Sequence, residues 1–432
     1  MLKAFFNRLS SLSHSSLKQE FTAGLTTFLT MGYILAVNPL ILSSTGMDAG
    51  AVFVATCLAA ALGSFLMGFV ANYPIALAPS MSLNVYFAYI VVGHLGYPWQ
   101  IALGAVFISG LLFALLTLTG VRQWLINFLP PALKTGIMAG IGLFLGLIGL
   151  KNLDLIALTP RPVLVPAHFM HLTVLLAAMG LGLIIVFERL KILGAIFISI
   201  LIMTLVGILL HLVTYQGMID FPPSIAPVFL KLQFPHAFDL KLAFATLIFL
   251  FVALFDNTGT LVAVLSQAQL VRPDGKIDRI QQALFADSVA NISGALLGTS
   301  STGSYIESAT GVRAGGKTGL TAIFVSLFFL ISLAFAPLVK TIPAYATAPA
   351  LIYVAFLMAK NLKYLWVNWV ENLPGLLTAL AIPCTFSIAM GVSLGLVAHG
   401  VLRILSGKIK TLNLGMWILL LISSSYLVLQ FK

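Results

Sequence analysis

Two acidic residues in strongly apolar surroundings are the first candidates for chemistry. Asp256 lies in FLFVALFDNTGTLVAV, where the following Asn, Thr and Gly predict a locally opened helix, and Glu307 lies in SSTGSYIESATG. If these stretches cross a membrane, an ionised carboxylate there costs at least about 2.5 kcal/mol, so such residues are rare and usually functional. The alternative is a structural role, in which neighbouring polar side chains hold each carboxylate. Asp287, in LFADSVANISGALLG, fits either a functional role or a packing network.

A glycine-rich stretch suggests a different chemistry. GVRAGGKT, at residues 311–318, fits the phosphate-binding pattern G-x-x-x-x-G-K-[ST]. In nucleotide-binding enzymes this loop follows a buried strand and opens a helix of a soluble domain. Here it follows the polar SSTGSYIESAT and precedes GLTAIFVSLFFLISLAFA, an apolar run long enough to span a membrane. We therefore expect a cytoplasmic turn anchored by Arg313 and Lys317, and not an ATP site.

Composition places these residues in a membrane protein. The chain has 432 residues, of which 60% are hydrophobic and 8% are charged, whereas soluble domains carry about 25% charged residues. Runs such as GAIFISILIMTLVGILLHLV are long enough to cross about 30 Å of hydrocarbon. Outer-membrane barrels are excluded because their strands alternate polar and apolar residues. Cys57 and Cys384 lie inside apolar spans and suggest neither a disulfide framework nor a metal site, so no metal and no cofactor are predicted.

The predicted fold class is an all-α polytopic membrane protein with about 14 transmembrane spans. The spans lie near 22–42, 49–71, 74–92, 99–120, 130–150, 171–187, 190–212, 241–265, 278–298, 300–313, 318–338, 346–362, 373–389 and 391–405. Whether the further apolar stretch 413–430 crosses the membrane stays open. With the N-terminus in the cytoplasm, most of the 23 Lys and Arg residues fall on the inner side. This distribution explains the net charge of +11 without a nucleic-acid partner.

The chain divides into two halves at its longest polar connection, 213–240. Each half contains seven predicted spans, and because seven is odd the halves have opposite orientations, as in the inverted repeats of many secondary transporters. Span 3 is interrupted by ALAPSMSLN, and its counterpart, span 10, is interrupted by GTSSTGSYIESATG. Paired broken spans at matching positions predict a binding site near the middle of the membrane.

Four segments resemble the signatures of the AzgA-like purine permeases: LFDNTGTLVAV, ADSVANISGALLGTSSTGSYIESATGVRAGGKTGLTA, EFTAGLTTFLTMGYILAVNPLIL and YPIALAPSMSLNVYFAY. These permeases belong to the nucleobase–cation symporter group, which includes uracil and xanthine permeases. The resemblance covers nearly the whole chain and implies the uracil-permease fold, with two inverted seven-span repeats and short strands in broken spans 3 and 10. It implies a core domain at 1–120 and 241–340 and a gate domain at 121–240 and 341–432.

The resemblance also implies roles for individual residues. Glu307 stands where the family has the carboxylate that hydrogen-bonds the base, and Asp256 stands where it has the acid of span 8. The expected substrate-binding residues are Glu307, Asp256, Thr260, Ser80, Ser82, Asn84 and Ser304. The expected proton-coupling residues are Asp256, Glu307 and Asp287.

This sequence departs from the family pattern beside the expected pocket. The family commonly reads A-P-G-M-G-L-N in span 3, where this chain reads APSMSLN, so Ser80 and Ser82 replace glycines. In span 10, TSSTGSY has Gly303 where the family often has a larger residue. These changes leave the fold expectation intact and leave the choice among purines open.

The expected function is import of adenine, guanine or hypoxanthine across the inner membrane by proton symport with alternating access. A carboxylate can accept the N–H groups of a purine in strong, charge-assisted bonds, and aromatic side chains can cover its flat faces. A buried carboxyl group can also take up and release a proton, which favours proton over sodium coupling. The expected partners are the base, the proton, the lipid bilayer and a second copy of the chain in a homodimer.

Two other functions compete with purine transport. An anion transporter of similar fold, like the sulfate permeases, is the first alternative. The two acids, with no clearly intramembrane Lys or Arg in the broken segments, argue against it. An intramembrane enzyme is the second, and it lacks a metal motif or a recognisable catalytic constellation. The chain is therefore expected not to be an enzyme.

Overall fold

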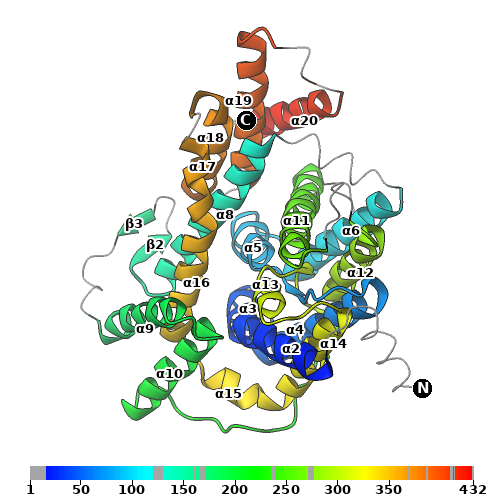
Figure 1. Cartoon of the computed structure of the whole chain (residues 1–432). Coiled ribbons are helices and arrows are strands. Elements are labelled where there is room, and N and C mark those ends of the chain that lie inside the picture. The colour runs from blue at the N-terminus through cyan, green and yellow to red at the C-terminus, as the bar shows by residue number, and fades with distance from the viewer. Residues whose placement is uncertain are drawn as a thin grey trace.

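Helices make up nearly all of the regular structure (Figure 1). The computed structural model describes residues 16–119, 130–158, 162–164, 171–234, 239–270, 277–366, 369–385, 388–408, 412 and 414–430. Within these residues, 7 helices are long and apolar enough to cross a membrane: Leu17–Ser43, Ala49–Ala71, Trp99–Leu118, Ala132–Lys151, Leu172–Arg189, Leu240–Leu261 and Gly319–Thr341. Shorter apolar helices include Met81–His94, Ala195–Leu209, Ala344–Ala359 and Met390–Leu405. The chain is a multi-pass membrane protein.

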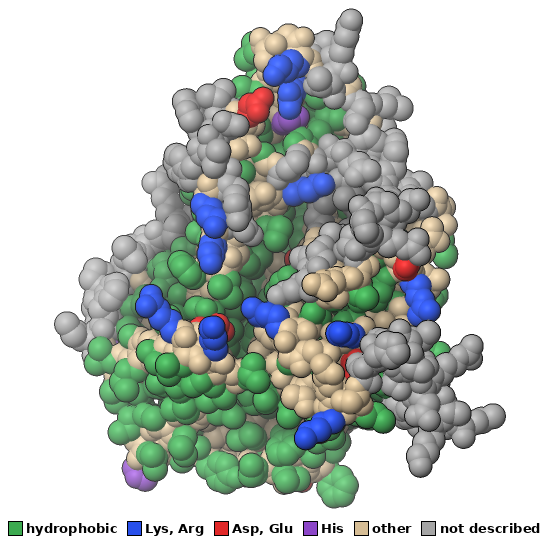
Figure 2. Space-filling view, viewed as in Figure 1, with side chains coloured by type: hydrophobic (Ala, Val, Ile, Leu, Met, Phe, Trp, Pro, Cys, Tyr) green, Lys and Arg blue, Asp and Glu red, His purple; other side chains and the backbone are tan. Residues whose placement is uncertain are grey.

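Large apolar side chains on the outside of several helices agree with this assignment. Leu118 on α6, Leu209 on α10 and Leu405 on α19 are 73%, 69% and 78% exposed. Figure 2 shows hydrophobic side chains over much of one face of the molecule, with Lys and Arg spread across its middle. A soluble monomer rarely exposes apolar surface on this scale, whereas in a bilayer such side chains contact lipid.

Helices from the two halves of the chain pack together in a first group. Its helices from the first half are α2 (Leu17–Met31), α3 (Ile34–Ser43), α4 (Ala49–Leu66) with η1 (Met67–Ala71), α5 (Met81–Val85) with η2 (Tyr86–His94), and α6 (Trp99–Leu118). Those from the second half are α11 (Leu240–Gln267), α12 (Ile280–Leu297), α13 (Ser308–Arg313), α14 (Gly319–Ser332) with η4 (Leu333–Phe335), and α15 (Ala336–Thr341). α14 packs against α2 and α4, α12 against α4 and α6, and α11 against α6.

The remaining helices form a second group around α8. It contains α8 (Pro131–Lys151), α9 (Leu172–Arg189), α10 (Ala195–Leu209), α16 (Ala344–Ala359), η5 (Lys360–Leu362), α17 (Lys363–Trp366), α18 (Trp369–Thr385), α19 (Ile388–Leu405) and α20 (Leu414–Gln430). α8 packs against both α16 and α18. The backbones of α8 and α18 nearly touch, since a Cβ added to Gly136 would lie 2.2 Å from the Gly375 carbonyl oxygen. Small residues commonly permit such close helix contacts in membranes. A short hairpin of β2 (Ile156–Leu158) and β3 (Pro162–Leu164) follows α8.

Two short strands meet inside the first group. β1 (Leu77–Pro79) pairs antiparallel with β4 (Thr302–Ser304), with Ala78 opposite Gly303. Two further backbone bonds extend the pairing, from Ser80 N to Ser301 O at 2.8 Å and from Tyr305 N to Ala76 O at 3.0 Å. Irregular backbone in hydrocarbon must have its polar groups satisfied by protein, and here each strand satisfies the other. α5 begins directly after β1, and α13 begins shortly after β4.

The glycine-rich turn before α14 surrounds a carboxylate of the protein itself. The backbone N–H groups of Lys317 and Thr318 each lie 3.2 Å from Glu20 Oε1, and the Thr321 hydroxyl donates to the other carboxylate oxygen. Glu20 is fully buried. An anion is favourable at a helix N-terminus, and Glu20 of α2 therefore fills the position that a phosphate occupies in a nucleotide-binding loop.

The glycines of this turn allow α2 to approach closely. A Cβ on Gly311 would lie 2.0 Å from Thr27 Oγ1, and one on Gly316 would lie 2.9 Å from Ala23 Cβ. Gly315 has a φ of +104°, which favours glycine. The GVRAGGKT sequence is thus explained by packing against α2.

Replacing Glu20 with Ala should lower the stability of the folded protein. The substitution leaves two backbone N–H groups and one hydroxyl buried without the carboxylate, and a hydrogen bond to a charged group contributes about 1.5–3 kcal/mol. Thermal unfolding in detergent should show a clear fall in the midpoint. Glu371→Ala is the control, because Glu371 is 64% exposed and forms a 3.8 Å surface ion pair with Lys408. An unfolding midpoint of Glu20→Ala equal to that of the control would contradict this role.

Candidate functional site

A cavity of about 440 Å³ lies between the two groups of helices. Small-molecule sites usually have volumes of roughly 300–1,000 Å³. One wall is polar and comes from the β1–α5 junction, from α11 and from the segment after β4. The facing wall is apolar and comes from α8 and α16. The cavity is lined by Tyr33, Ser80, Met81, Ser82, Met138, Asp256, Gly259, Thr260, Ser304, Tyr305, Ile306, Glu307, Val354, Leu357 and Met358.

Most of the residues expected to bind substrate lie around this cavity. They are Glu307, Asp256, Thr260, Ser80, Ser82 and Ser304. Asn84 and Asp287 are not among the lining residues. The two candidate acids come from α11 and from the turn before α13, 51 positions apart in the sequence. The packing of α11 against β4 brings them to the same cavity.

Asp256 is held by the two serines that replace the family's glycines. Ser80 Oγ lies 3.2 Å and Ser82 Oγ lies 3.1 Å from Asp256 Oδ2, and the hydroxyl oxygens lie 3.0 Å from each other. Both hydroxyls thus contact one carboxylate oxygen and orient the group. The predicted opening of the helix at this point is wrong, because α11 continues unbroken from Leu240 to Gln267.

Glu307 is held by a tyrosine that sequence reasoning missed. Tyr33, between α2 and α3, donates its hydroxyl to Glu307 Oε1 at 2.7 Å. The neighbouring turn is fixed by a contact of 2.9 Å between the hydroxyls of Thr30 and Thr310. Tyr33 lies in the segment EFTAGLTTFLTMGYILAVNPLIL. A polar hydroxyl in this apolar run is the one sequence feature that could have indicated Tyr33 as a site residue.

Asn84 belongs to a buried polar network beside the cavity. It donates to Asn38 Oδ1 and accepts from the Ser300 hydroxyl. Asn38 in turn donates to Thr56 at 2.6 Å and to Thr299 at 3.0 Å. The network joins α3, α4 and α5 to the segment before β4, so the geometry gives Asn84 a structural role rather than a contact with the cavity.

Asp287 does not line the cavity but hydrogen-bonds a residue that does. Its side chain is fully buried on α12, and its Oδ1 accepts from the Ser304 hydroxyl at 3.3 Å. Ser304 itself lines the cavity. Asp287 can therefore influence a ligand through Ser304.

Gly303 allows β4 to lie directly against α11. A Cβ at Gly303 would lie 2.1 Å from Asn257 Oδ1, and Asn257 is the residue after Asp256 in the helix. A larger residue therefore has no room while Asn257 is present. This contact holds Asp256, the residue before Asn257, close to β4 and so to Ser304.

The sequence comparisons identify the family to which these features belong. The Permease family of xanthine and uracil permeases matches residues 18–399. The chain belongs to this family. It is 43% identical to the adenine permease AdeP of Escherichia coli, over 92% of this chain and 89% of that protein. It is 40% identical to the guanine/hypoxanthine permease PbuG of Bacillus subtilis, over 92% and 93% of the two chains.

These relatives confirm the resemblance to purine permeases. A third relative, the guanine/hypoxanthine permease GhxP of Escherichia coli O157:H7, is 39% identical to this chain, over 93% of this chain and 91% of its own length. Because its relatives are permeases, the chain is a membrane transporter and not an enzyme.

Solved structures of anion transporters share the fold. The transmembrane domain of the cyanobacterial bicarbonate transporter BicA has a TM-score of 0.64 and 18% identity, covering 89% of this chain and 97% of that domain. SLC26A9 has a TM-score of 0.65 and 13% identity, covering 94% of this chain and 69% of its own. At such low identity the likeness shows only a common architecture.

Replacing Gly303 with Ala should distort the site, and a second substitution should correct it. The new methyl group would overlap Asn257, so we expect a lower unfolding midpoint and weaker purine binding. Adding Asn257→Ala to the same chain should restore much of both, because it removes the overlapping atoms. Gly259→Ala is the stability control, since a Cβ there meets nothing within 4 Å. An unfolding midpoint of Gly303→Ala equal to that of the parent chain would contradict the close contact between Gly303 and Asn257.

Proposed function

We propose that this chain imports purine nucleobases by proton symport with an alternating-access mechanism. The observation that carries the proposal is that Asp256 and Glu307 line one cavity between two helix groups. Adenine, guanine and hypoxanthine are the candidate substrates, since relatives that are 39–43% identical are named for them.

The polar wall suits a neutral ligand with several N–H donors. Tyr33 contacts Glu307 Oε1, and the serines contact Asp256 Oδ2. Glu307 Oε2 and Asp256 Oδ1 are therefore the oxygens we assign to the base. The Thr260 hydroxyl can donate to a ring nitrogen or carbonyl group of the base. The Ser304 hydroxyl donates to Asp287, so it can accept an N–H group of the base.

The apolar wall suits the flat face of a purine. Met138, Val354, Leu357 and Met358 line it, and flexible methionines adapt well to a ligand surface. Among the residues that the structure describes, the lining includes two carboxyl groups and no Lys or Arg. Because like charges repel, this charge pattern opposes binding of an anion, and we prefer purine transport to the anion-transporter alternative.

A proton is the simplest coupling ion for this site. Binding of the base needs carboxylate oxygens as acceptors, and a carboxyl group that exchanges a proton changes its hydrogen-bonding capacity. Asp256 and Glu307 are our candidates to carry the proton, with Asp287 acting through Ser304. Sodium coupling is the less favoured alternative.

The arrangement of the helices supports the proposed mechanism. We assign residues 1–120 and 241–340 to a core domain and residues 121–240 and 341–432 to a gate domain. The packing of α12 against α4 and α6, and of α8 against α16 and α18, supports this assignment. Fourteen spans in two inverted repeats, an inner-membrane location with a cytoplasmic N-terminus, and a homodimer complete the proposal.

Substitution of the two acids should separate binding from coupling. Glu307→Gln should weaken purine binding by roughly tenfold to over a hundredfold, because a hydrogen bond to a charged acceptor contributes about 1.5–3 kcal/mol. Asp256→Asn should reduce proton-driven uptake more than equilibrium exchange of labelled base. Calorimetry on purified protein and uptake by proteoliposomes provide the measurements.

Two outcomes would contradict these assignments. Unchanged purine affinity in Glu307→Gln would remove its binding role. For the parent, uptake should rise as external pH falls and should collapse when a protonophore is added. Uptake that ignores both treatments and depends on a sodium gradient would overturn proton coupling.

Replacing Ser80 and Ser82 with Gly should change the selectivity among purines. The double substitution frees Asp256 Oδ2 from both hydroxyls and opens space beside it. We expect the relative potencies of adenine, guanine and hypoxanthine as competitors to shift more than the amount of folded protein. Ser326→Gly on α14 is a control for loss of a buried serine outside the site. An unchanged competition profile would show that these serines do not influence ligand choice.

A further inference from the structure

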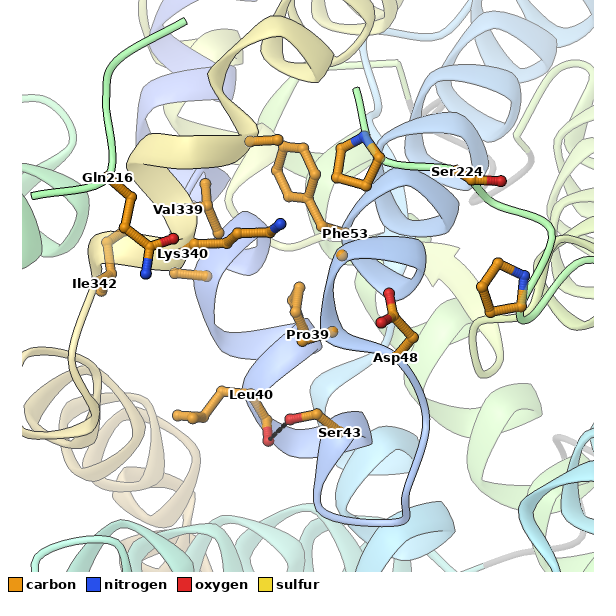
Figure 3. Close-up of a pocket in the computed structure, with 16 residues that line it drawn as sticks. Pro39, Leu40, Ser43, Asp48, Phe53, Gln216, Ser224, Val339, Lys340 and Ile342 are labelled. Carbon is orange, nitrogen blue, oxygen red and sulfur yellow. Dashed lines mark hydrogen bonds between the residues drawn. The ribbon is translucent and has the colours of Figure 1, made fainter. Parts of the chain in front are cut away.

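A second cavity, of about 590 Å³, lies at the other end of α3 from Glu307. Figure 3 shows side chains that reach it from α3, the start of α4, α15 and the segment that precedes α11. We call it the outer cavity, because a cytoplasmic N-terminus directs the C-terminal end of α3 outward. The proposed transport mechanism gives this cavity no role.

The two cavities lie along one face of α3. Tyr33 lines the substrate cavity, whereas Leu40 and Ser43 line the outer cavity. Residues spaced by three, four or seven positions share a helix face, and seven residues span about 10 Å along the axis. The two cavities are therefore successive spaces along one helix.

The chain from Ile342 into α16 lines the two cavities in the opposite order. Ile342, just before α16, lines the outer cavity, and Val354 and Leu357 in its later turns line the substrate cavity. α3 and α16 thus run antiparallel, and they are in contact with each other. A ligand that moves along α3 from one cavity to the other would pass this contact.

Polar groups of the outer cavity resemble those needed for a nucleobase. Lys340 extends across it from α15, and Asp48 reaches into it from the start of α4 (Figure 3). Asp48 Oδ1 caps α4 by accepting from Ala51 N at 2.7 Å, which leaves Oδ2 for another donor. One acceptor, one donor and the amide of Gln216, set among Pro39 and Val339, suit a neutral, flat molecule with both kinds of group.

We propose that the outer cavity is a subsite that receives the purine base before it passes the α3–α16 contact. The inference rests on the proposed transport of purines. A base held there by Asp48 and Lys340 stands at the outer side of that contact and enters the substrate cavity when α16 moves away from α3.

Cysteine labelling tests occupancy directly. Cys384 is exposed and Cys57 is buried, so the background chain carries Cys384→Ser. Ser224→Cys places a thiol in the lining, and Thr214→Cys, in the same segment but outside the lining, is the matched control. At ten times its dissociation constant, adenine or hypoxanthine should slow labelling of Ser224→Cys by an impermeant maleimide about tenfold. Labelling of Thr214→Cys should not change.

The same labelling in a Glu307→Gln background distinguishes two causes of protection. One is base bound in the outer cavity, and the other is base bound in the substrate cavity that changes the reactivity of the thiol from a distance. Protection that persists supports a separate site. Loss of protection in this background, or no protection by either base in any background, overturns the proposal. Failure of purine transport itself has a different signature, because the parent chain would then take up no base at all.

A second experiment measures uptake from the outside and binding from the inside separately. Asp48→Asn with Lys340→Met should raise KM for uptake from the outside about tenfold, the effect of losing one hydrogen bond to a charged group. Asn still caps a helix well, so α4 should be retained. Binding from the inside, in inside-out vesicles, should stay unchanged, as should both values in the control Lys231→Met. An unchanged outer KM in the double variant overturns the proposal.

Discussion

The antiparallel pairing of β1 with β4 is the contact on which the site depends. It satisfies the backbone groups of two broken spans, which hydrocarbon cannot do. It also fixes the residues just beyond each strand, with Ser80 and Ser82 after β1 and Glu307 after β4. Gly303, in β4, then lets α11 approach until Asn257 contacts the strand. One short pairing thereby positions side chains from three separate stretches of the chain.

Much of the architecture could be predicted from the sequence, because hydropathy reports directly on membrane helices. The predicted spans near 99–120 and 241–265 correspond to α6 and α11, with ends that differ by a few residues. The interruptions ALAPSMSLN and GTSSTGSYIESATG contain β1 and β4. Broken spans are visible in a sequence because they are too short and too polar for an uninterrupted helix.

The detailed contacts were beyond sequence reasoning. Ser82 lines the cavity and Asn84, two positions later in α5, does not, because residues two positions apart on a helix point to different sides. The partner of Glu307 is Tyr33, 274 positions away, and no local pattern signals such a pair. The nucleotide-like motif carried no sign that Glu20, from another helix, fills it.

The anchoring of α2 has a consequence for the time course of binding. Glu20 and Thr30 of α2 contact Thr318 and Thr310, and Tyr33, just after α2, contacts Glu307, so this part of the chain holds the polar wall of the cavity. The apolar wall belongs to α8 and α16, which pack mainly in the other group. If the groups move as bodies, the wall that recognises the base keeps its shape while the wall that covers it approaches and withdraws. Substitutions in the polar wall should then govern which base is accepted, and substitutions at Leu357 or Met358 should govern its residence time.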